Sequence, residues 1–344
     1  MLKPVKFKAA AVQAAPVFLN TPATVDKACA LMREAAAHGA SLVVFPEVFI
    51  PAYPYWSWVG TPVAGSPWFQ RLCEQAIEVP GPEVARIAQT AKSLGVHVAI
   101  GINERSARSV SLLYNTLLLI GPDGRLLGRH RKLVPTWAEK MTWAHGDGSS
   151  LRVHDTAVGP IGMLACGENT NTLARFALLA QGELVHLASY ISLPVAPPDY
   201  DMAEAIKLRA MAHSFEGKVY TIVSCSTVSN EIVEAMEQAF PGSRELLQRR
   251  SSAFSGVIGP DGRLVGSPLI DDEGIVYADI DLARCIQPRQ MHDITGNYNR
   301  FDVFDLRVDR RARQAAAFTD DVAEEPIDLA AMAPEAREPV RRKT

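Results

Sequence analysis

The segment IGPDGRLLG (residues 120–128) returns later in the chain as IGPDGRLVG (residues 258–266). A Pro-Asp-Gly sequence between apolar runs favours a tight turn, because proline presets φ and glycine accepts a positive φ. Each copy therefore predicts a hairpin between two strands. Two hairpins of one design, one in each half of the chain, suggest two similar sheets packed together with helices outside. Coincidence of turn chemistry is the alternative, since the repeated segment is short.

Strand and helix signals alternate around these hairpins. The predicted strands are 8–13, 41–45, 96–100, 161–165, 184–187 and 219–224, and the predicted helices are 22–38, 83–94, 173–181 and 202–215. Thr21 is the expected N-cap of the first helix, because Pro22 follows it at a position that favours proline. Repeated strand–helix units place helices against sheet faces, so the pattern predicts an α/β protein.

The composition limits the classes of partner. Of the 344 residues, 48% are hydrophobic and 21% are charged, with a formal net charge of -3. Mixed charges create no field that would attract nucleic acid or an anionic membrane, so a small neutral partner is expected. No apolar run approaches the ~18 residues of a membrane span. Five scattered cysteines without a CxxC pair argue against disulfides or a zinc site, which favours the cytoplasm.

The chain changes character near its C-terminal end. From Asp309 onward, charge blocks, alanines and prolines replace the large apolar residues. Such a composition cannot build a core alone, so it is typical of a segment that is disordered or becomes ordered on a partner. We therefore expect one domain over residues 1–308 and a tail over residues 309–344.

Three reactive side chains follow predicted strands, at the sheet edge where α/β proteins bind ligands. Glu47 lies among bulky apolar residues, which would raise its pKa toward the range of a general base, although exposed glutamates are common. Lys132 follows a strand and precedes an aromatic loop, from which an ammonium could face a developing anion. A solvated basic patch is the alternative for Lys132, because His130 and Arg131 precede it.

Cys166 ends the predicted strand 161–165 and precedes a helix that Asn171 or Thr172 would cap. The positive end of a helix dipole lowers a thiol pKa and so supplies a nucleophilic thiolate. The alternative is an inert packed thiol, which is the expectation for Cys225 in its apolar run.

Taken together, these segments resemble the nitrilase superfamily, whose members carry a glutamate, a lysine and a cysteine in this order. The match is close to the nitrilase branch and spans roughly residues 6–308. The segments that carry it are FPE (45–47), PAYP (51–54), HRKL (130–133), PT (135–136), Cys166 with Glu168, ARFAL (174–178), QGE (181–183), HSFE (213–216) and YNRFDV (298–303).

The resemblance implies a four-layer αββα sandwich and specific catalytic roles. Glu47 would deprotonate Cys166 and later activate water, Lys132 would stabilise tetrahedral intermediates, and Glu139 would help orient the site. The reaction would convert a small nitrile to a carboxylic acid and ammonia through a thioimidate and a thioester, with no metal or organic cofactor. The resemblance also implies a homo-oligomer, either a dimer or a larger spiral built through C-terminal contacts.

The candidate substrate-binding residues are Tyr53, Trp137, Gly167, Glu168 and Asn169, with the backbone N–H of Gly167 as an oxyanion donor. Core packing is the alternative role for the aromatic residues. The sequence departs from the family at Gly167, where tryptophan is usual, at Ala52, where glycine is usual, and at Asn297, where histidine is usual. The first departure touches the pocket, so some amide product is expected beside the acid.

Two other functions compete with a nitrilase. An amidase or carbamoyl-amide hydrolase would use the same glutamate, lysine and cysteine on the same fold. A catalytically silent scaffold is the non-enzymatic alternative, but all four catalytic positions carry competent residues. His213 is expected to be a packed helix residue, because the catalytic set is complete without it.

Overall fold

The computed structural model describes residues 5–197, 199–313 and 316. Its strands are β1 (Lys6–Gln13), β2 (Leu42–Val44), β3 (His97–Arg105), β4 (Leu113–Ile120), β5 (Leu126–Arg131), β6 (His154–Thr156), β7 (Gly159–Ala165), β8 (Val185–Tyr190), β9 (Tyr220–Cys225), β10 (Phe254–Ile258), β11 (Leu269–Ile270) and β12 (Gly274–Asp281). Its α-helices are α1 (Thr21–Ala37), α2 (Trp56–Val59), α3 (Pro62–Gln75), α4 (Pro82–Leu94), α5 (Thr172–Leu179), α6 (Met202–Gly217), α7 (Asn230–Ala239), α8 (Ser243–Leu247) and α9 (Ile286–His292).

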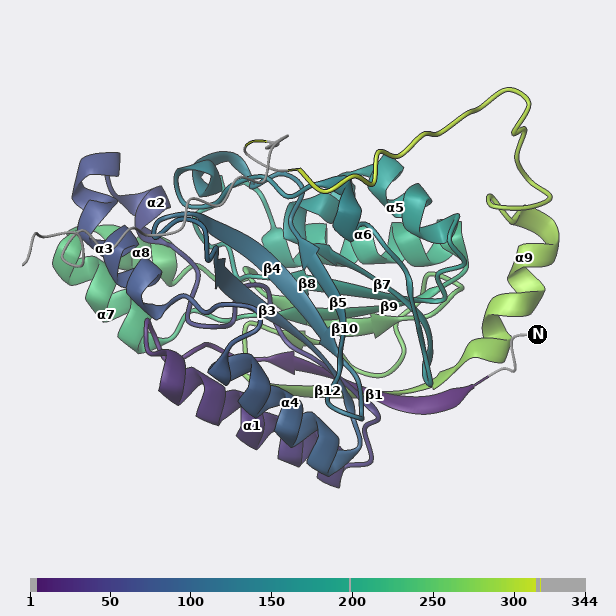
Figure 1. The fold of residues 1–344 in the computed structure, drawn as a ribbon, viewed down its shortest axis with the longest axis horizontal. Coiled ribbons are helices and arrows are strands. Elements are labelled where there is room, and N and C mark those ends of the chain that lie inside the picture. Colours follow the sequence, from purple (N-terminus) through teal and green to yellow (C-terminus); the bar gives the residue numbers. More distant parts are fainter. Residues whose placement is uncertain (1–4, 198, 314–315, 317–344) are drawn as a thin grey trace, which may run out of the picture. The chain divides into compact units, whose positions relative to one another are not determined.

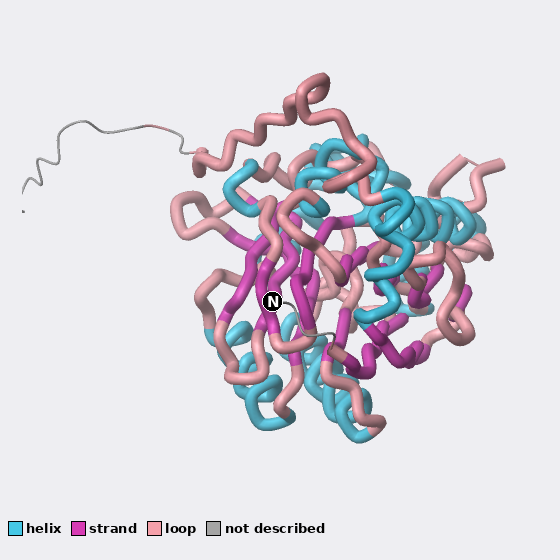
Figure 2. The backbone as a smooth tube through the Cα atoms, turned by 90° about the vertical axis from the view of Figure 1, so that its right-hand side faces the viewer, coloured by secondary structure: helices cyan, strands magenta, loops and turns pink. Residues whose placement is uncertain are grey.

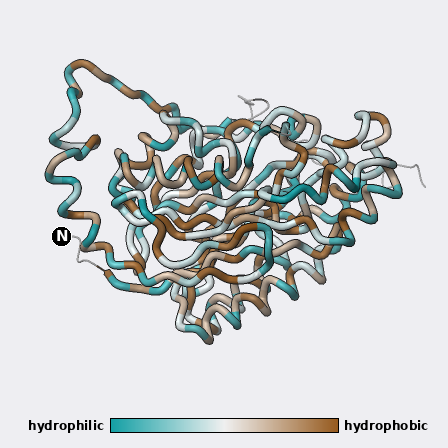
Figure 3. The backbone as a smooth tube through the Cα atoms, turned by 180° about the vertical axis from the view of Figure 1, so that it is seen from behind, coloured by the Kyte–Doolittle hydropathy of each residue, from teal (hydrophilic) through white to brown (hydrophobic). Residues whose placement is uncertain are grey.

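Within the described residues, the strands form two six-stranded sheets of order β12-β1-β2-β3-β4-β5 and β11-β10-β9-β8-β7-β6. Alternate apolar residues of both sheets, such as Ala11, Leu42, Met163 and Leu187, share one buried cluster between the sheets. Helices α1 and α4 cover the outer face of the first sheet, and α5 and α6 cover that of the second (Figures 1 and 2). Figure 3 shows the hydrophobic segments concentrated in the central strands. The predicted αββα sandwich is confirmed.

The middle of each sheet consists of three parallel strands. In the first sheet β1, β2 and β3 run parallel, and in the second β7, β8 and β9 do. Strands β4 and β10 flank these triplets in antiparallel orientation. Parallel neighbours bring their carboxyl ends to the same edge, where functional side chains gather in α/β folds. Glu47 follows β2 and Cys166 follows β7 at these edges.

Both predicted hairpins form, but they differ in length. The first joins β4 to β5, and its turn is closed by the Gly121 N–H donating to the Arg125 carbonyl at 2.8 Å. In the second, Gly259 donates to Arg263 at 2.8 Å in the same way, and the returning chain makes one bridge between Ile258 and Leu264. Pairing with β10 then resumes only at the two-residue strand β11.

The start of α1 differs from the prediction. The N-cap is Asn20, whose side chain accepts a hydrogen bond from the N–H of Ala23 at 3.1 Å, and Thr21 is the first helical residue. Asparagine is at least as good an N-cap as threonine, so the sequence allowed both. Helix α3 was not predicted, because Pro62 and Pro67 obscure its pattern.

The described fold forms one compact unit that extends to Ala312. Residues 309–313 are exposed and belong to no helix or strand. Most of the predicted tail, over residues 309–344, lies outside the described residues. No described helix combines the length and apolar character that crossing a membrane requires.

Candidate active site

Glu47 lies in the loop after β2 and is buried at 1% exposure. The backbone fixes it on both sides: its N–H donates to the Tyr190 carbonyl at 3.2 Å, and a Cβ at Gly101 of β3 would overlap the loop. One carboxylate oxygen, Oε1, accepts from Asn115 Nδ2 at 2.6 Å and from Lys132 Nζ at 2.8 Å. The other, Oε2, is buried and has no hydrogen-bond partner among the residues that the structure describes. Glu47 therefore has one oxygen free to accept a proton.

Lys132 follows β5 and contacts two carboxylates at once. Its Nζ lies 2.8 Å from Glu47 Oε1 and 2.7 Å from Glu139 Oε2, and all three side chains are buried. Burial opposes the charge, but Glu139 and Glu47 outweigh it and hold the pKa of Lys132 well above its usual range. Lys132 therefore stays an ammonium at neutral pH.

Glu139 lies on the 3₁₀ helix η1 (Trp137–Met141), and its oxygens are all engaged. Oε2 accepts from the Thr136 N–H at 2.7 Å as well as from Lys132, and Oε1 accepts from the Tyr53 hydroxyl at 3.0 Å. Glu139 is therefore an anchored counter-charge for Lys132.

The same cluster shifts the pKa of Glu47 upward. Burial raises it most, the Lys132 ammonium opposes this, and the negative charge of Glu139 adds to it, so that the pKa reaches about 7. A carboxyl group that titrates near neutral pH can both take up and release a proton during a reaction. The free Oε2 is the atom that would exchange it.

Cys166 directly follows β7, has a φ of 46° and begins the 3₁₀ helix η3 (Cys166–Thr170). Its side chain is 5% exposed. The expected lowering of its pKa is wrong: burial, with a further contribution from Glu47, raises the pKa of the thiol well above its usual range, although Lys132 and Arg209 oppose this. One turn of 3₁₀ helix is too weak a dipole to offset desolvation. The resting thiol is therefore protonated, and a base must remove its proton.

Glu168 and Asn169 hold the turn at Cys166. Glu168 accepts from His130 Nε2 at 3.0 Å, from the Leu133 N–H at 2.6 Å and from the Ala165 N–H at 2.9 Å. It thus joins the segment after Lys132 to the end of β7. Asn169 donates from Nδ2 to the carbonyl of Cys166 at 3.0 Å. The polar atoms of both predicted substrate-binding side chains are therefore engaged with the protein itself.

The other three predicted substrate-binding residues lie in different settings. Tyr53 is buried, donates to Glu139 and accepts from Trp58 Nε1 at 2.9 Å. Trp137 is 75% exposed and meets Trp58 edge-on, with ring centroids 5.8 Å apart. At Gly167 a Cβ would meet one atom within 4 Å, Thr136 Oγ1 at 2.9 Å. A side chain at Gly167 would therefore require the Thr136 side chain to shift.

Sequence reasoning did not find two residues that shape this site. Asn115 on β4 holds Glu47 from a strand 68 positions further along the chain, and its only signal was a polar residue in an apolar strand. Arg209 on α6 lies over η3, where its Nε donates to Thr170 at 2.7 Å. The solvated basic patch that was the alternative for this segment does not include His130, which is buried and pairs with Glu168.

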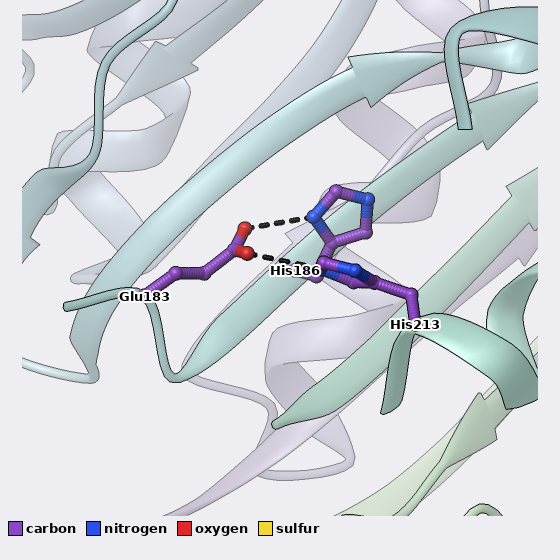
Figure 4. Close-up of side chains that lie close together, drawn as sticks. All are labelled: Glu183, His186 and His213. Carbon is purple, nitrogen blue, oxygen red and sulfur yellow. Dashed lines mark hydrogen bonds and ion pairs between the residues drawn. The ribbon is translucent and has the colours of Figure 1, made fainter. Parts of the chain in front are cut away.

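One further group of polar side chains is close enough to be considered for a metal ion. Among the described residues, Glu183, His186 and His213 bring their ligand atoms within 4.8 Å of one another. Figure 4 shows the Glu183 carboxylate pointing at both rings, with Oε1 2.7 Å from His186 Nδ1 and Oε2 3.0 Å from His213 Nε2. These distances fit direct hydrogen bonds between the side chains.

Comparisons with known proteins identify the family of this chain. Residues 8–290 match the sequence model of the carbon-nitrogen hydrolase family. The chain is 38% identical over 309 residues to an aliphatic nitrilase from Rhodococcus rhodochrous, covering 89% of this chain and 83% of the relative. It is 35% identical over 321 residues to a bifunctional nitrilase/nitrile hydratase from Lupinus angustifolius, covering 91% and 88%. A carbon-nitrogen hydrolase structure from Helicobacter pylori superposes with a TM-score of 0.66 at 21% identity, covering 83% of this chain and 93% of that chain.

Proposed function

Because this chain belongs to the carbon-nitrogen hydrolase family, in its nitrilase branch, we propose that it hydrolyses a small nitrile to a carboxylic acid and ammonia through a covalent intermediate on Cys166. One observation supports this most: Glu47 has a free buried oxygen and a pKa of about 7 beside a lysine that stays charged. That combination supplies a base and a fixed cation in the same site as a protonated thiol. The Rhodococcus rhodochrous relative is named an aliphatic nitrilase, which supports a nitrile substrate.

The first half of the reaction forms a thioimidate. Glu47 takes the thiol proton of Cys166, the sulfur bonds to the nitrile carbon, and the proton passes to the nitrile nitrogen. Glu47 then takes a proton from water, whose oxygen adds to the same carbon. Lys132 and the N–H of Gly167 are placed to stabilise the charge of the resulting tetrahedral intermediate.

The second half releases both products. Glu47 returns its proton to the nitrogen and also relays to it the proton of the new hydroxyl group. The C–N bond then breaks, ammonia leaves and a thioester remains on Cys166. A second water, deprotonated by Glu47, attacks this thioester, and the carboxylic acid leaves as the thiol regains its proton. Two waters are consumed for each nitrile. Glu139 keeps Lys132 charged throughout, since it binds the ammonium at 2.7 Å.

Matched pairs of nitriles and amides with the same side chain test this function, with ammonia release as the readout. We expect turnover of at least one nitrile to exceed that of its amide. Faster turnover of the amides would instead identify an amidase on the same residues. Absence of turnover for both sets, with Cys166 unreactive toward iodoacetamide, would identify a silent scaffold.

We further propose that the enzyme releases some products as amides, because Gly167 places no side chain beside the nucleophile to orient the intermediate. An amide forms when the intermediate expels the thiolate before ammonia, and ~1.4 kcal/mol between the two barriers changes the ratio tenfold. The Lupinus angustifolius relative is named a bifunctional nitrilase/nitrile hydratase, which supports this partition. Gly167→Trp should shift the acid-to-amide ratio or narrow the substrate range. The proposal of an amide product is refuted if the parent makes only acid and Gly167→Trp changes neither the acid-to-amide ratio nor the substrate range.

We also propose a homo-oligomer that uses the segment after Arg300. In this segment Phe301, Val303 and Phe304 are exposed by more than half, as side chains in a subunit contact would be before assembly. Truncation after Val308 should change the elution volume by more than the lost mass explains. An unchanged oligomer would show that residues 309–344 take no part. The cytoplasmic location inferred from the sequence stays a proposal.

A further inference from the structure

Behind the turn that carries Cys166, three buried side chains form hydrogen bonds that the proposed chemistry does not use. Glu183 precedes β8, His186 lies on β8 and His213 lies on α6, and none is more than 1% exposed. One oxygen of Glu183 contacts each ring, as Figure 4 shows. The second nitrogen of His186, Nε2, lies 2.8 Å from Asn169 Oδ1. The cluster is therefore linked through Asn169 to Cys166.

The orientation of the Asn169 amide is set by its neighbours. Its nitrogen faces two carbonyl oxygens, that of Cys166 at 3.0 Å and that of Leu164 at 3.4 Å, which can only accept hydrogen bonds. The amide oxygen therefore faces His186, and Nε2 of His186 must carry a proton. The opposite nitrogen, Nδ1, faces the Glu183 carboxylate at 2.7 Å. Both nitrogens of His186 thus point at oxygen acceptors.

The two outer members of the cluster, Glu183 and His213, differ in charge. Burial alone would raise the pKa of Glu183, but the two histidines lower it to about 2, so the carboxyl group is ionised. Burial and the neighbouring His186 lower the pKa of His213 to about 4, so this ring is neutral, and its Nδ1 has no partner. The Glu183 carboxylate and the Asn169 amide oxygen therefore hold the His186 ring at its two nitrogens.

The backbone of β7 is shaped to admit this pair. Gly162 lies opposite His186 in the parallel register of β7 and β8. A Cβ at Gly162 would overlap the Glu183 carboxylate, so only glycine lets Glu183 lie over β7 and reach the ring. The other end of the chain of hydrogen bonds reaches Cys166, whose φ of 46° is unfavourable for a residue with a side chain. Such a conformation persists only where its surroundings fix it.

We propose that Glu183, His186 and Asn169 form a positioning chain that holds the backbone of Cys166 in its left-handed conformation and so aims the thiol at Glu47. Its effect on turnover rests on the proposed nitrile hydrolysis. Its effect on the reactivity of the Cys166 thiol does not, because alkylation needs no nitrile. His213 contacts the same carboxylate but not Asn169, so it lies outside the positioning chain.

Two substitutions at His186 test the contributions of its two ring nitrogens separately. An asparagine side chain approximates Nδ1 and keeps a donor near Glu183, whereas a glutamine approximates Nε2 and keeps one near Asn169. His213→Asn is the matched control, because it removes a hydrogen bond from the same buried carboxylate and leaves Asn169 untouched. Iodoacetamide labelling at neutral pH, read for each cysteine peptide by mass spectrometry, is measured beside kcat, KM and Tm. Buried Cys225 reports any general loosening of the fold.

His186→Asn should slow alkylation of Cys166 about tenfold and lower kcat about 10²-fold with KM within about threefold, as a misplaced nucleophile would. His186→Gln should recover most of both losses. His213→Asn should stay within about threefold of the parent in both rates, even where its Tm falls. Cys225 should stay unreactive in all three. Asn169→Ala should reproduce His186→Asn, and it replaces that variant should His186→Asn fail to fold.

Three results would overturn the positioning chain. One is alkylation of Cys166 that is slowed equally in His213→Asn and His186→Asn. Another is a lower Tm for His186→Asn with unchanged kcat and an unchanged rate of Cys166 alkylation. The third is a stoichiometric metal ion in the purified protein by elemental analysis, which would leave no proton on Nδ1. A parent without nitrile turnover that still shows the labelling differences would refute the proposed function and support the positioning chain.

Discussion

Two buried glutamates, Glu47 and Glu183, differ sharply in chemistry although both are excluded from solvent. One oxygen of Glu47 accepts two hydrogen bonds, and the other has no partner among the described residues. The pKa of Glu47 is about 7. On Glu183 each oxygen has its own imidazole donor, and the pKa is about 2. The number of partners on each oxygen, rather than burial, separates a carboxyl group that can move a proton from one that anchors its neighbours.

The balance of charge in the two clusters explains the same difference. Around Lys132 two carboxylates share one cation, and Glu139 is further held by Tyr53 and Thr136. Burial and the nearby charge of Glu139 raise the pKa of Glu47, although Lys132 opposes this. Around Glu183 a single carboxylate has two histidine partners.

The largest contrast is expected from one substitution made at both sites. Glu47→Gln removes the base and should lower kcat/KM by about 10³ to 10⁴-fold, since members of a catalytic unit act together. Its Tm should change little. Glu183→Gln leaves a buried partner uncompensated and should reduce the free energy of unfolding by about 3–5 kcal/mol. Thermal unfolding and kinetics of both variants check this, and the reverse pattern would mean that the two roles are exchanged.

Glu139→Gln is expected to have the next largest effect. It keeps the shape of the side chain but removes the charge that holds Lys132, so kcat should fall about 10²-fold. Tyr53→Phe is the control, because it removes a hydrogen bond to Glu139 at 3.0 Å and leaves the charge. Its loss should be smaller, about tenfold or less. Near-normal rates for Glu139→Gln would place this residue outside the reaction.

Much of this arrangement could be predicted from sequence. The strand ends at Glu47 and Cys166 were visible as apolar runs followed by reactive residues, and the repeated turn predicted the two sheets. The rise in the pKa of Cys166 could not be predicted from the sequence, because the argument from a local helix dipole omits the desolvation that packing imposes. Asn115 was missed because only tertiary pairing brings β4 to the loop after β2.

The pH dependence of kcat/KM offers a sharper test of Glu47. The base must be ionised, so kcat/KM should be constant above a pH of about 7 and fall as the pH drops below it. The charge of Glu139 raises the pKa of Glu47, so residual activity of Glu139→Gln should show this fall at a lower pH. A fall that begins at the same pH in both proteins would show that Glu47 is not the titrating group.

Asn115→Ala is expected to shift the pH profile in the direction opposite to Glu139→Gln. The hydrogen bond from Asn115 lowers the pKa of Glu47, so Asn115→Ala should move the fall in kcat/KM to a higher pH. Loss of one hydrogen bond to a charged group should cost about tenfold at pH 7. Profiles of Asn115→Ala and Glu139→Gln that shift in the same direction would contradict the assignment.

The most direct measurement is the intact mass of the enzyme, quenched with acid during turnover of a slowly hydrolysed nitrile. Attack by Cys166 predicts a protein carrying the thioimidate or the acyl group, with the adduct on the Cys166 peptide. Cys166→Ala should show no adduct and lose about 10⁴-fold or more in turnover, whereas Cys225→Ala should keep both. An adduct on another residue, or appreciable turnover by Cys166→Ala, would contradict covalent catalysis at Cys166.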